Sequence, residues 1–265
     1  MLRTINFMGV RNIAFAITVL LTVLALFSMF HKGMNYGLDF TGGTLIELTY
    51  EKPADLGLVR DELVKAGYHD AVVQNFGATT DLLVRMPGED PQLGNQVAAA
   101  LQTVGGDNPA TVKRVEFVGP QVGEELRDQG GLGMLLALGG VLVYLAFRFQ
   151  WKFAVGAILS LIHDVIVTVG LLSFFQITFD LTVLAAVLAI IGYSLNDTIV
   201  VFDRVRENFR VMRKASLIEN INVSTTQTLL RTVATSVSTL LAIAALMFFG
   251  GDNLWGFSLA LFIGV

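Results

Sequence analysis

Long apolar stretches dominate this sequence and constrain its fold more than any other feature. Five of them are long enough to cross a bilayer as single helices. They are Ile13–Phe30, about 131–147, Phe153–Phe175, Leu181–Phe202 and Leu229–Phe249. Hydrophobic residues make up 54% of the chain and charged residues only 15%, which excludes a soluble globular protein of this length. The sequence therefore predicts an α-helical polytopic membrane protein.

A sixth apolar stretch begins at Leu254 and reaches Val265. As a helix it would extend about 18 Å, which is short of the ~30 Å hydrocarbon core of a bilayer. We expect the natural protein to continue, so that the sixth span is truncated in this chain. The first span is predicted to be a retained anchor, because its apolar run is too long for a signal peptide and no small-x-small cleavage site follows Phe30.

Basic residues predict the orientation of the spans. Arg3 and Arg11 precede the first span, Arg148 and Lys152 separate the second from the third, and several Arg and Lys residues follow the fourth. The loops 176–180 and 250–253 contain no Lys or Arg. By the positive-inside rule, the N-terminus, the 148–152 turn and a segment at about 203–228 are cytoplasmic. The acidic segment 31–130 is then expected outside.

Residues 31–130 are predicted to form a small α+β domain between spans one and two. Alternating strand patterns occupy Thr44–Tyr50, Ala71–Phe76, Asp81–Met86 and Thr111–Val118. Helical spacing of apolar residues occurs at Asp55–Tyr68 and about 92–104. The order β-α-β-β-α-β is that of the ferredoxin-like split βαβ unit. The predicted organisation is thus residues 1–30 as N-terminus and first span, 31–130 as outer domain, and 131–265 as the remaining spans.

Glycine and proline mark the two junctions between this domain and the spans. Gly42 and Gly43 end the segment that leaves span one, and Pro120 starts the segment that enters span two. Glycine permits the positive φ angles of a tight turn and proline fixes φ. We predict a structural hinge at Gly42, Gly43 and Pro120, without a ligand.

Asp197 is the residue that points most directly to function. It lies about 8 Å inside the fourth span if the helix is regular. A carboxylate at such a depth costs about 2.5–3.5 kcal/mol and usually marks an ion or proton pathway. Arg231, at a similar expected depth in span five, is the natural counter-ion. Making and breaking this pair would let Asp197 carry a proton, whereas a static pair would only fix the helix register.

Other polar residues of the spans are expected to face the same interior. The candidates for proton relay or support are Asp164, His163, Asn196, Ser194, Tyr193 and Thr235. Polar faces on successive spans turn inward and meet, because lipid does not satisfy them. For Asp164 two interpretations stay equally open: a functional role, or a purely structural carboxylate that is hydrogen-bonded by His163 or a neighbouring Ser or Thr.

Enzyme classes find little support in the sequence. It contains no cysteine, no H-E-x-x-H zinc motif and no G-x-S-x-G nucleophile elbow. Asp164 and Asp197 suggest an aspartyl protease only weakly, since the Gly-x-Gly-Asp sequence of such proteases is absent. We expect no catalytic residue, no metal, no cofactor other than protons as coupling ion, and no nucleic-acid partner.

Several motifs resemble the SecF members of the SecD/SecF family of bacterial protein-export membrane proteins. The resemblance covers essentially the whole chain. It depends on Gly37–Gly43, Val118–Pro120, Phe147–Phe149, His163–Val165, Gly192–Arg204, Arg231–Ser236 and Gly250–Gly251.

The resemblance implies one six-span half of a resistance-nodulation-division transporter, completed by SecD, in the bacterial inner membrane. It implies partnership with the SecYEG channel, YajC and YidC, and use of the proton-motive force on exported unfolded preproteins. It also implies that Asp197 and Arg231 are the intramembrane acid and its basic partner. Two alternatives stay open. One is a docking subunit without a proton path of its own. The other is a small-molecule proton antiporter, although the outer domain is too small to hold a drug-sized pocket.

Overall fold

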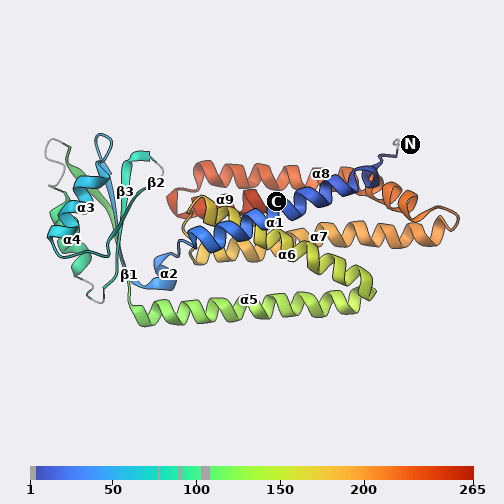
Figure 1. Ribbon diagram of the computed structural model, residues 1–265, viewed down its shortest axis with the longest axis horizontal. Coiled ribbons are helices and arrows are strands. Elements are labelled where there is room, and N and C mark those ends of the chain that lie inside the picture. The colour runs from blue at the N-terminus through green and yellow to red at the C-terminus, as the bar shows by residue number, and fades with distance from the viewer. Residues whose placement is uncertain (1–3, 77, 89, 91, 103–107) are drawn as a thin grey trace. The chain divides into compact units, whose positions relative to one another are not determined.

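The computed structural model describes residues 4–76, 78–88, 90, 92–102 and 108–265, and it divides into two compact units. One unit contains residues 36–132, and the other contains the residues up to Asn35 together with Gly133–Val265. The first is the α+β domain and the second is the helix bundle (Figure 1). The mostly helical architecture with a small sheet domain confirms the predicted fold class.

The α+β domain has the six elements that the sequence predicts. They are β1 (Gly43–Tyr50), α3 (Leu56–Lys65), β2 (Val72–Phe76), β3 (Ala78–Met86), α4 (Leu93–Leu101) and β4 (Ala110–Val118), preceded by the short α2 (Leu38–Thr41). The antiparallel sheet has the order β2-β3-β1-β4. Because β3 lies between β1 and β2, the βαβ unit is split as predicted. The second helix ends at Leu101, and residues 103–104 of its predicted range lie outside the described residues.

The core of this domain lies between one face of the sheet and the helices α3 and α4, which cover that face (Figure 1). Alternate residues of each strand contribute, for example Ile46 and Leu48 of β1 and Leu82 and Val84 of β3, all fully buried. Asp55 starts α3 by accepting hydrogen bonds from the backbone N–H groups of Gly57 and Leu58. Alternation and a cap of this kind are the signals that the sequence analysis used.

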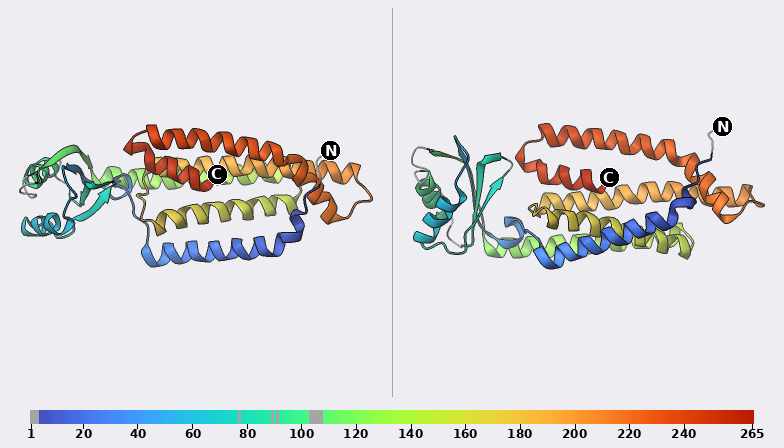
Figure 2. Two further views of the ribbon diagram at one scale, coloured as in Figure 1. Left: turned by 90° about the horizontal axis from the view of Figure 1, so that it is seen from above. Right: turned by 45° about the horizontal axis from the view of Figure 1, so that its top comes forward.

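The helix bundle contains five helices long and apolar enough to span a membrane among the described residues. They are η1 with α1 (Phe7–Val10, Arg11–Lys32), α5 (Pro120–Arg148), α6 (Trp151–Phe174), α7 (Leu181–Val211) and α8 (Leu217–Phe249); the shorter α9 (Asp252–Gly264) follows. Helix α7 packs against α6, α8 and α9, and α1 packs against α6. Figure 2 shows these helices running side by side in both views. Every predicted span thus lies in a helix, except that Phe175 and Val265 each lie one residue beyond the helix end.

Two helices extend well beyond their predicted spans. The segment 203–228 is almost entirely helical, since α7 continues to Val211 and α8 begins at Leu217, well before the predicted span at Leu229. Ser216 and Glu219 explain the early start: Ser216 Oγ accepts a hydrogen bond from the backbone N–H of Glu219 at 3.1 Å. The sequence Ser-x-x-Glu is a capping box. Arg231 therefore lies about 21 Å from the start of its helix.

Gly170 of α6 lets the backbone of α1 approach α6 closely. A Cβ on Gly170 of α6 would lie 2.3 Å from Ala25 Cβ and 2.6 Å from Ala25 Cα of α1. Small residues at such crossings let two helices pack without a hydrophobic driving force from lipid. Gly170 thus fixes how α1 lies on α6.

We expect Gly170→Ala to destabilise the bundle by about 1–3 kcal/mol, the usual cost of overpacking. The measurement is thermal unfolding of the detergent-solubilised chain. Gly192→Ala is the matched control, because a Cβ there meets no atom within 4 Å. Ala25→Gly should recover part of the loss in the Gly170→Ala background. Equal effects of the Gly170 and Gly192 substitutions would contradict the proposed contact.

Candidate functional site

The predicted site residues fall into small hydrogen-bonded groups on three neighbouring helices. Helix α7 lies between α6 and α8 and contributes to every group. Its polar residues Tyr193, Ser194 and Asp197 lie within about one helical turn of each other along the axis. They point to different neighbours, because successive residues of a helix are rotated by about 100°. The site is therefore built around α7.

Asp197 is held by a threonine of α8. Thr232 Oγ1 donates a hydrogen bond to Asp197 Oδ1 over 2.7 Å, and both side chains are half-buried. Among the ion pairs of the described residues, none joins Asp197 to Arg231. The expected counter-ion is thus replaced in this structure by its sequence neighbour. The Thr232 hydroxyl is a neutral donor. This contact therefore brings no positive charge to Asp197.

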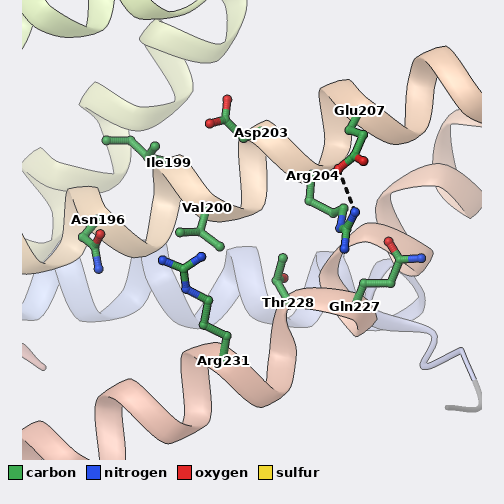
Figure 3. A pocket seen from close by; sticks show the side chains of 9 residues that line it. All are labelled: Asn196, Ile199, Val200, Asp203, Arg204, Glu207, Gln227, Thr228 and Arg231. Carbon is green, nitrogen blue, oxygen red and sulfur yellow. Dashed lines mark hydrogen bonds and ion pairs between the residues drawn. The ribbon is translucent and has the colours of Figure 1, made fainter.

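Arg231 lies instead in a groove between α7 and α8. Its side chain reaches from α8 toward α7, with the guanidinium beside Asn196 and Val200 (Figure 3). Asn196 and Arg231 are both exposed. Arg231 is displaced around the α8 axis from Thr232 by one residue, so the two side chains cannot both face Asp197 directly. The structure brings Asp197 and Arg231 to the same pair of helices but not into contact.

A second acid, Asp164 of α6, forms its own group. Ser194 Oγ of α7 donates to Asp164 Oδ2 over 2.6 Å, and His163 Nδ1 lies 3.0 Å from Asp164 Oδ1. His163 Nε2 is buried and makes no hydrogen bond within the part of the chain that the structure describes. Because Ser194 precedes Asp197 by three residues, this group lies about 4.5 Å from Asp197 along the α7 axis. The two acids are neighbours with separate hydrogen-bond partners.

Tyr193 and Thr235, two further candidates, form hydrogen bonds that do not involve Asp197 or Asp164. Tyr193 Oη donates to Ser236 Oγ of α8 over 3.2 Å. Thr235 donates to the carbonyls of Arg231 and Thr232 in its own helix, at 3.0 and 2.9 Å. Among the described residues Thr235 thus makes its hydrogen bonds within α8, whereas Thr232 is the donor to Asp197. Such back-bonding is common for threonine inside membrane helices.

The hinge residues lie together inside the α+β domain. Gly42 and Gly43 have φ angles of +65° and +107°. A Cβ on Gly42 would lie 2.9 Å from Pro120 Cα, and one on Gly43 would lie 2.4 Å from the Met86 carbonyl oxygen. The two glycines thus combine a left-handed backbone with close backbone approach, a combination that side chains do not tolerate. Pro120 begins α5 immediately beside them.

A buried polar group between α7 and α8 was not predicted. Asn208 Nδ2 donates to Ser224 Oγ at 2.8 Å and to Gln227 Oε1 at 2.9 Å. Asn220 and Ser224 are fully buried beside it. The signal in the sequence is the i, i+4 recurrence of polar residues at 220, 224, 228 and 232 on α8, which points inward once the early helix start is recognised. These contacts join the two helix extensions.

The N-terminus is also fastened to α8, at a place that sequence reasoning missed. The backbone N–H of Ile5 donates to Thr226 Oγ1 at 3.0 Å, and that of Met8 donates to Asn222 Oδ1 at 2.9 Å. Asn222 Nδ2 donates to Asn6 Oδ1 at 3.1 Å. Asn222 and Thr226 are buried. We call this set of contacts the N-terminal clasp.

Two family models match the chain. "Protein export membrane protein SecD/SecF, C-terminal" matches residues 96–265, and the "SecD/SecF GG Motif" matches residues 27–54. A protein translocase subunit SecF from Pseudomonas aeruginosa is 77% identical, over 99% of this chain and 86% of that protein. The SecF of Escherichia coli O157:H7 is 50% identical over 95% of this chain and 79% of its own length. The chain belongs to the SecF family.

A solved structure agrees with this family membership. The crystal structure of SecDF from Thermus thermophilus, a translocon-associated membrane protein, matches with a TM-score of 0.88 at 40% identity. The match covers 99% of this chain but only 36% of the SecDF chain. A second structure of SecDF, in a super-membrane-facing form, has a TM-score of 0.70 and the same 36% coverage. The residues matched by the SecD/SecF GG Motif, 27–54, include Gly42 and Gly43, whose geometry is described above.

The hydrogen bond between Thr232 and Asp197 yields a stability prediction. Thr232→Val removes the donor and leaves the carboxylate short of one partner, which costs about 1–3 kcal/mol. Thr232→Ser keeps the hydroxyl and is expected to lose much less. Thermal unfolding in detergent measures both, and the Val effect should shrink in an Asp197→Leu background, which lacks the acceptor, as in a double-mutant cycle. A larger loss for Ser than for Val would show that the methyl group, not the hydrogen bond, matters here.

Proposed function

We propose that this chain is a subunit of a SecDF-type protein translocase and that it uses the proton-motive force to promote late steps of protein export. Its partners are SecD, the SecYEG channel, YajC and YidC, and it acts on exported unfolded preproteins. The chain is not an enzyme in this proposal, and protons are its coupling ion. It lies in the bacterial inner membrane, with a cytoplasmic N-terminus and residues 31–130 in the periplasm.

The observation that carries this proposal is a hydrogen-bonded carboxylate pair on adjacent membrane helices, in a chain of the SecF family. Asp197 and Asp164 each have a hydroxyl donor, Thr232 and Ser194, at 2.7 and 2.6 Å. Neither has an Arg or Lys within ion-pair distance among the described residues. In the proposed cycle these two acids are the groups that take up and release the proton, because ionisable residues inside membrane spans usually mark such pathways.

A proton-coupled cycle also needs a second arrangement of charges, and Arg231 supports one. It lies on the residue before Thr232, so a rotation of α8 by about 100° would exchange the two in front of Asp197. An arginine there favours the carboxylate, whereas the hydroxyl accepts either form. Proton release and helix rotation are thereby coupled. Each proton that crosses supplies about 2.3 kcal/mol per 100 mV.

The test is preprotein transport into inverted membrane vesicles that carry the translocase with or without this chain. Transport is measured with the proton-motive force present and after an ionophore has collapsed it. We expect the force-dependent component to require the chain. If collapse of the force lowers transport equally in both vesicle types, the chain is a docking subunit without a proton path. Force-dependent efflux of small amphiphiles instead of preprotein transport would support the antiporter.

A further inference from the structure

The turn between α5 and α6 is packed against α7 at one end of the helix bundle. Helix α5 ends at Arg148 and α6 begins at Trp151, so that only Phe149 and Gln150 join them. Phe149 is buried, and its ring meets the ring of Phe202 of α7 edge to face, with the centroids 6.0 Å apart. Four residues of this turn and of α7 form what we call the basic corner: Arg148, Trp151, Lys152 and Arg206.

The positive charge of the basic corner exceeds the negative charge beside it. Arg148 and Arg206 both pair with the same carboxylate, that of Asp203 on α7, and Arg206 Nη1 lies 3.6 Å from Asp203 Oδ1. Lys152 forms no ion pair among the described residues, and its Nζ lies 5.8 Å from the centroid of the Trp151 ring. Three cations beside one carboxylate leave two positive charges uncompensated at this end of the bundle.

One buried ring holds the two guanidinium groups of the basic corner in place. Arg148 Cζ lies 5.2 Å and Arg206 Cζ lies 5.7 Å from the centroid of the Phe149 ring. Arg206 Nη1 also donates to the backbone carbonyl of Arg148 at 3.4 Å. Arginine has five N–H donors in a planar fork that matches the oxygens of a phosphate group. The contacts given above use only some of these donors, so the pair has further N–H groups to offer a phosphate.

Exposed aromatic side chains adjoin these cations and favour a lipid over a soluble anion. The exposed fraction is 73% for Trp151 and 89% for Phe147. Both rings lie at the ends of predicted spans, and tryptophan in particular is enriched at the membrane–water interface. A soluble phosphate ester would contact the cations alone. A phospholipid offers a phosphodiester to the cations and acyl chains to the rings, so it matches both parts of the surface.

We propose that the basic corner binds the headgroup of an anionic phospholipid. The phosphodiester lies at Arg148, Arg206 and Lys152, and the acyl chains lie against Trp151 and Phe147. A lipid with a net negative charge is preferred to a zwitterionic one, because the uncompensated positive charge repels a second, cationic group on the headgroup. Basic pockets between transmembrane helices bind anionic headgroups in this way. This binding requires neither a membrane potential nor a preprotein, so it does not depend on the proposed function.

Trp151 itself reports the bound lipid. The chain has two tryptophans, so a Trp255→Phe background leaves Trp151 as the single indole fluorophore. The full chain is reconstituted into phosphatidylcholine bilayers that contain increasing fractions of brominated phosphatidylglycerol or brominated phosphatidylcholine. Quenching of Trp151 by the bromine atoms gives the relative affinity of the two lipids. We expect phosphatidylglycerol to bind at least about fivefold more tightly, which is the effect of about one basic group near an anionic membrane surface.

Lys152→Gln is the main variant, because Lys152 takes part in no ion pair of the described residues and its loss leaves the packing of the turn unchanged. It should reduce the preference for phosphatidylglycerol to less than about half of its original value. Arg206→Gln should also reduce it. Lys214→Gln is the matched control, since Lys214 is an exposed lysine of the connection between α7 and α8, outside the basic corner. This control should keep the full preference.

Three results would each overturn the proposal. The first is equal quenching by the two brominated lipids in the chain that retains all its basic residues. The second is an equal reduction for Lys152→Gln and Lys214→Gln, since lipid selectivity would then follow the overall surface charge and not a local site. The third is loss of the preference when millimolar glycerol 3-phosphate is added, because the site would then bind free phosphate esters. A preference that persists in its presence supports a lipid as the occupant.

Discussion

Asp197→Asn is expected to remove the dependence of preprotein transport on the proton-motive force, leaving transport at the rate measured after collapse of that force. Asparagine cannot bind or release a proton at this position. Its amide oxygen still accepts the hydrogen bond that Thr232 gives to Asp197, so the contact between α7 and α8 survives. The measurement is transport into energised inverted vesicles, together with co-purification of SecD as evidence of assembly.

Glu219→Gln is the control for loss of a carboxylate alone. Glu219 is an exposed residue of the first turn of α8, and glutamine also serves in a capping box. This variant should keep the full response to the proton-motive force. If Asp197→Asn also keeps it while SecD is bound, Asp197 has a structural role and the proton path must lie elsewhere. Asp164→Asn, tested in parallel, shows whether the second acid contributes to the response.

Gly43→Ala is expected to destabilise the α+β domain by about 3 kcal/mol or more. A Cβ at this position would lie 2.4 Å from the Met86 carbonyl oxygen, which belongs to the backbone and cannot rotate away. The φ angle of +107° adds a strain of about 1–3 kcal/mol for any residue with a side chain. Gly43 starts β1, one of the two interior strands, and pairs with Val118 of β4. The substitution therefore disturbs the pairing of β1 with both of its neighbouring strands, β3 and β4.

Limited proteolysis of the full chain in detergent measures this loss, through the rate of cleavage within residues 36–132. Gly67→Ala is the matched control, since Gly67 also has a positive φ, of +93°, but nothing lies within 4 Å of its Cβ position. We expect a loss of about 1 kcal/mol there. Similar cleavage rates for the two variants would show that backbone conformation, not the close approach to Met86, accounts for the glycine.

The sequence was sufficient to predict the helices and the split βαβ domain, because both depend on periodicity. An apolar run as long as Leu181–Phe202 forms a helix in a membrane, because only a helix satisfies its backbone hydrogen bonds there. The alternation in Thr44–Tyr50 predicts a strand with one face in the core. Helix length was underestimated where polar residues continue a helix beyond the membrane. Ser216 and Glu219 mark the start of α8 in the sequence. A hydropathy profile does not detect a capping box, because its residues are polar.

The site was predictable in its residues and not in its contacts. Asp197, Asp164 and Arg231 stand out because charge is rare inside apolar spans. Which α8 residue meets Asp197 depends on rotation about the helix axis, and one residue changes that rotation by about 100°. Sequence spacing does not determine the rotation of one helix against another. That Thr232 rather than Arg231 contacts Asp197 is therefore visible only in the packed structure of the helices.

The N-terminal clasp has a consequence for the order in which this protein assembles. Ile5 and Thr226 are 221 residues apart in the chain. During synthesis the N-terminal segment emerges first, and it must wait for nearly the whole chain before its backbone N–H groups find their acceptors on α8. Contacts of such long separation form late in folding. The clasp can therefore close only after α8 has been synthesised as far as Thr226, which makes its closure a late step of assembly.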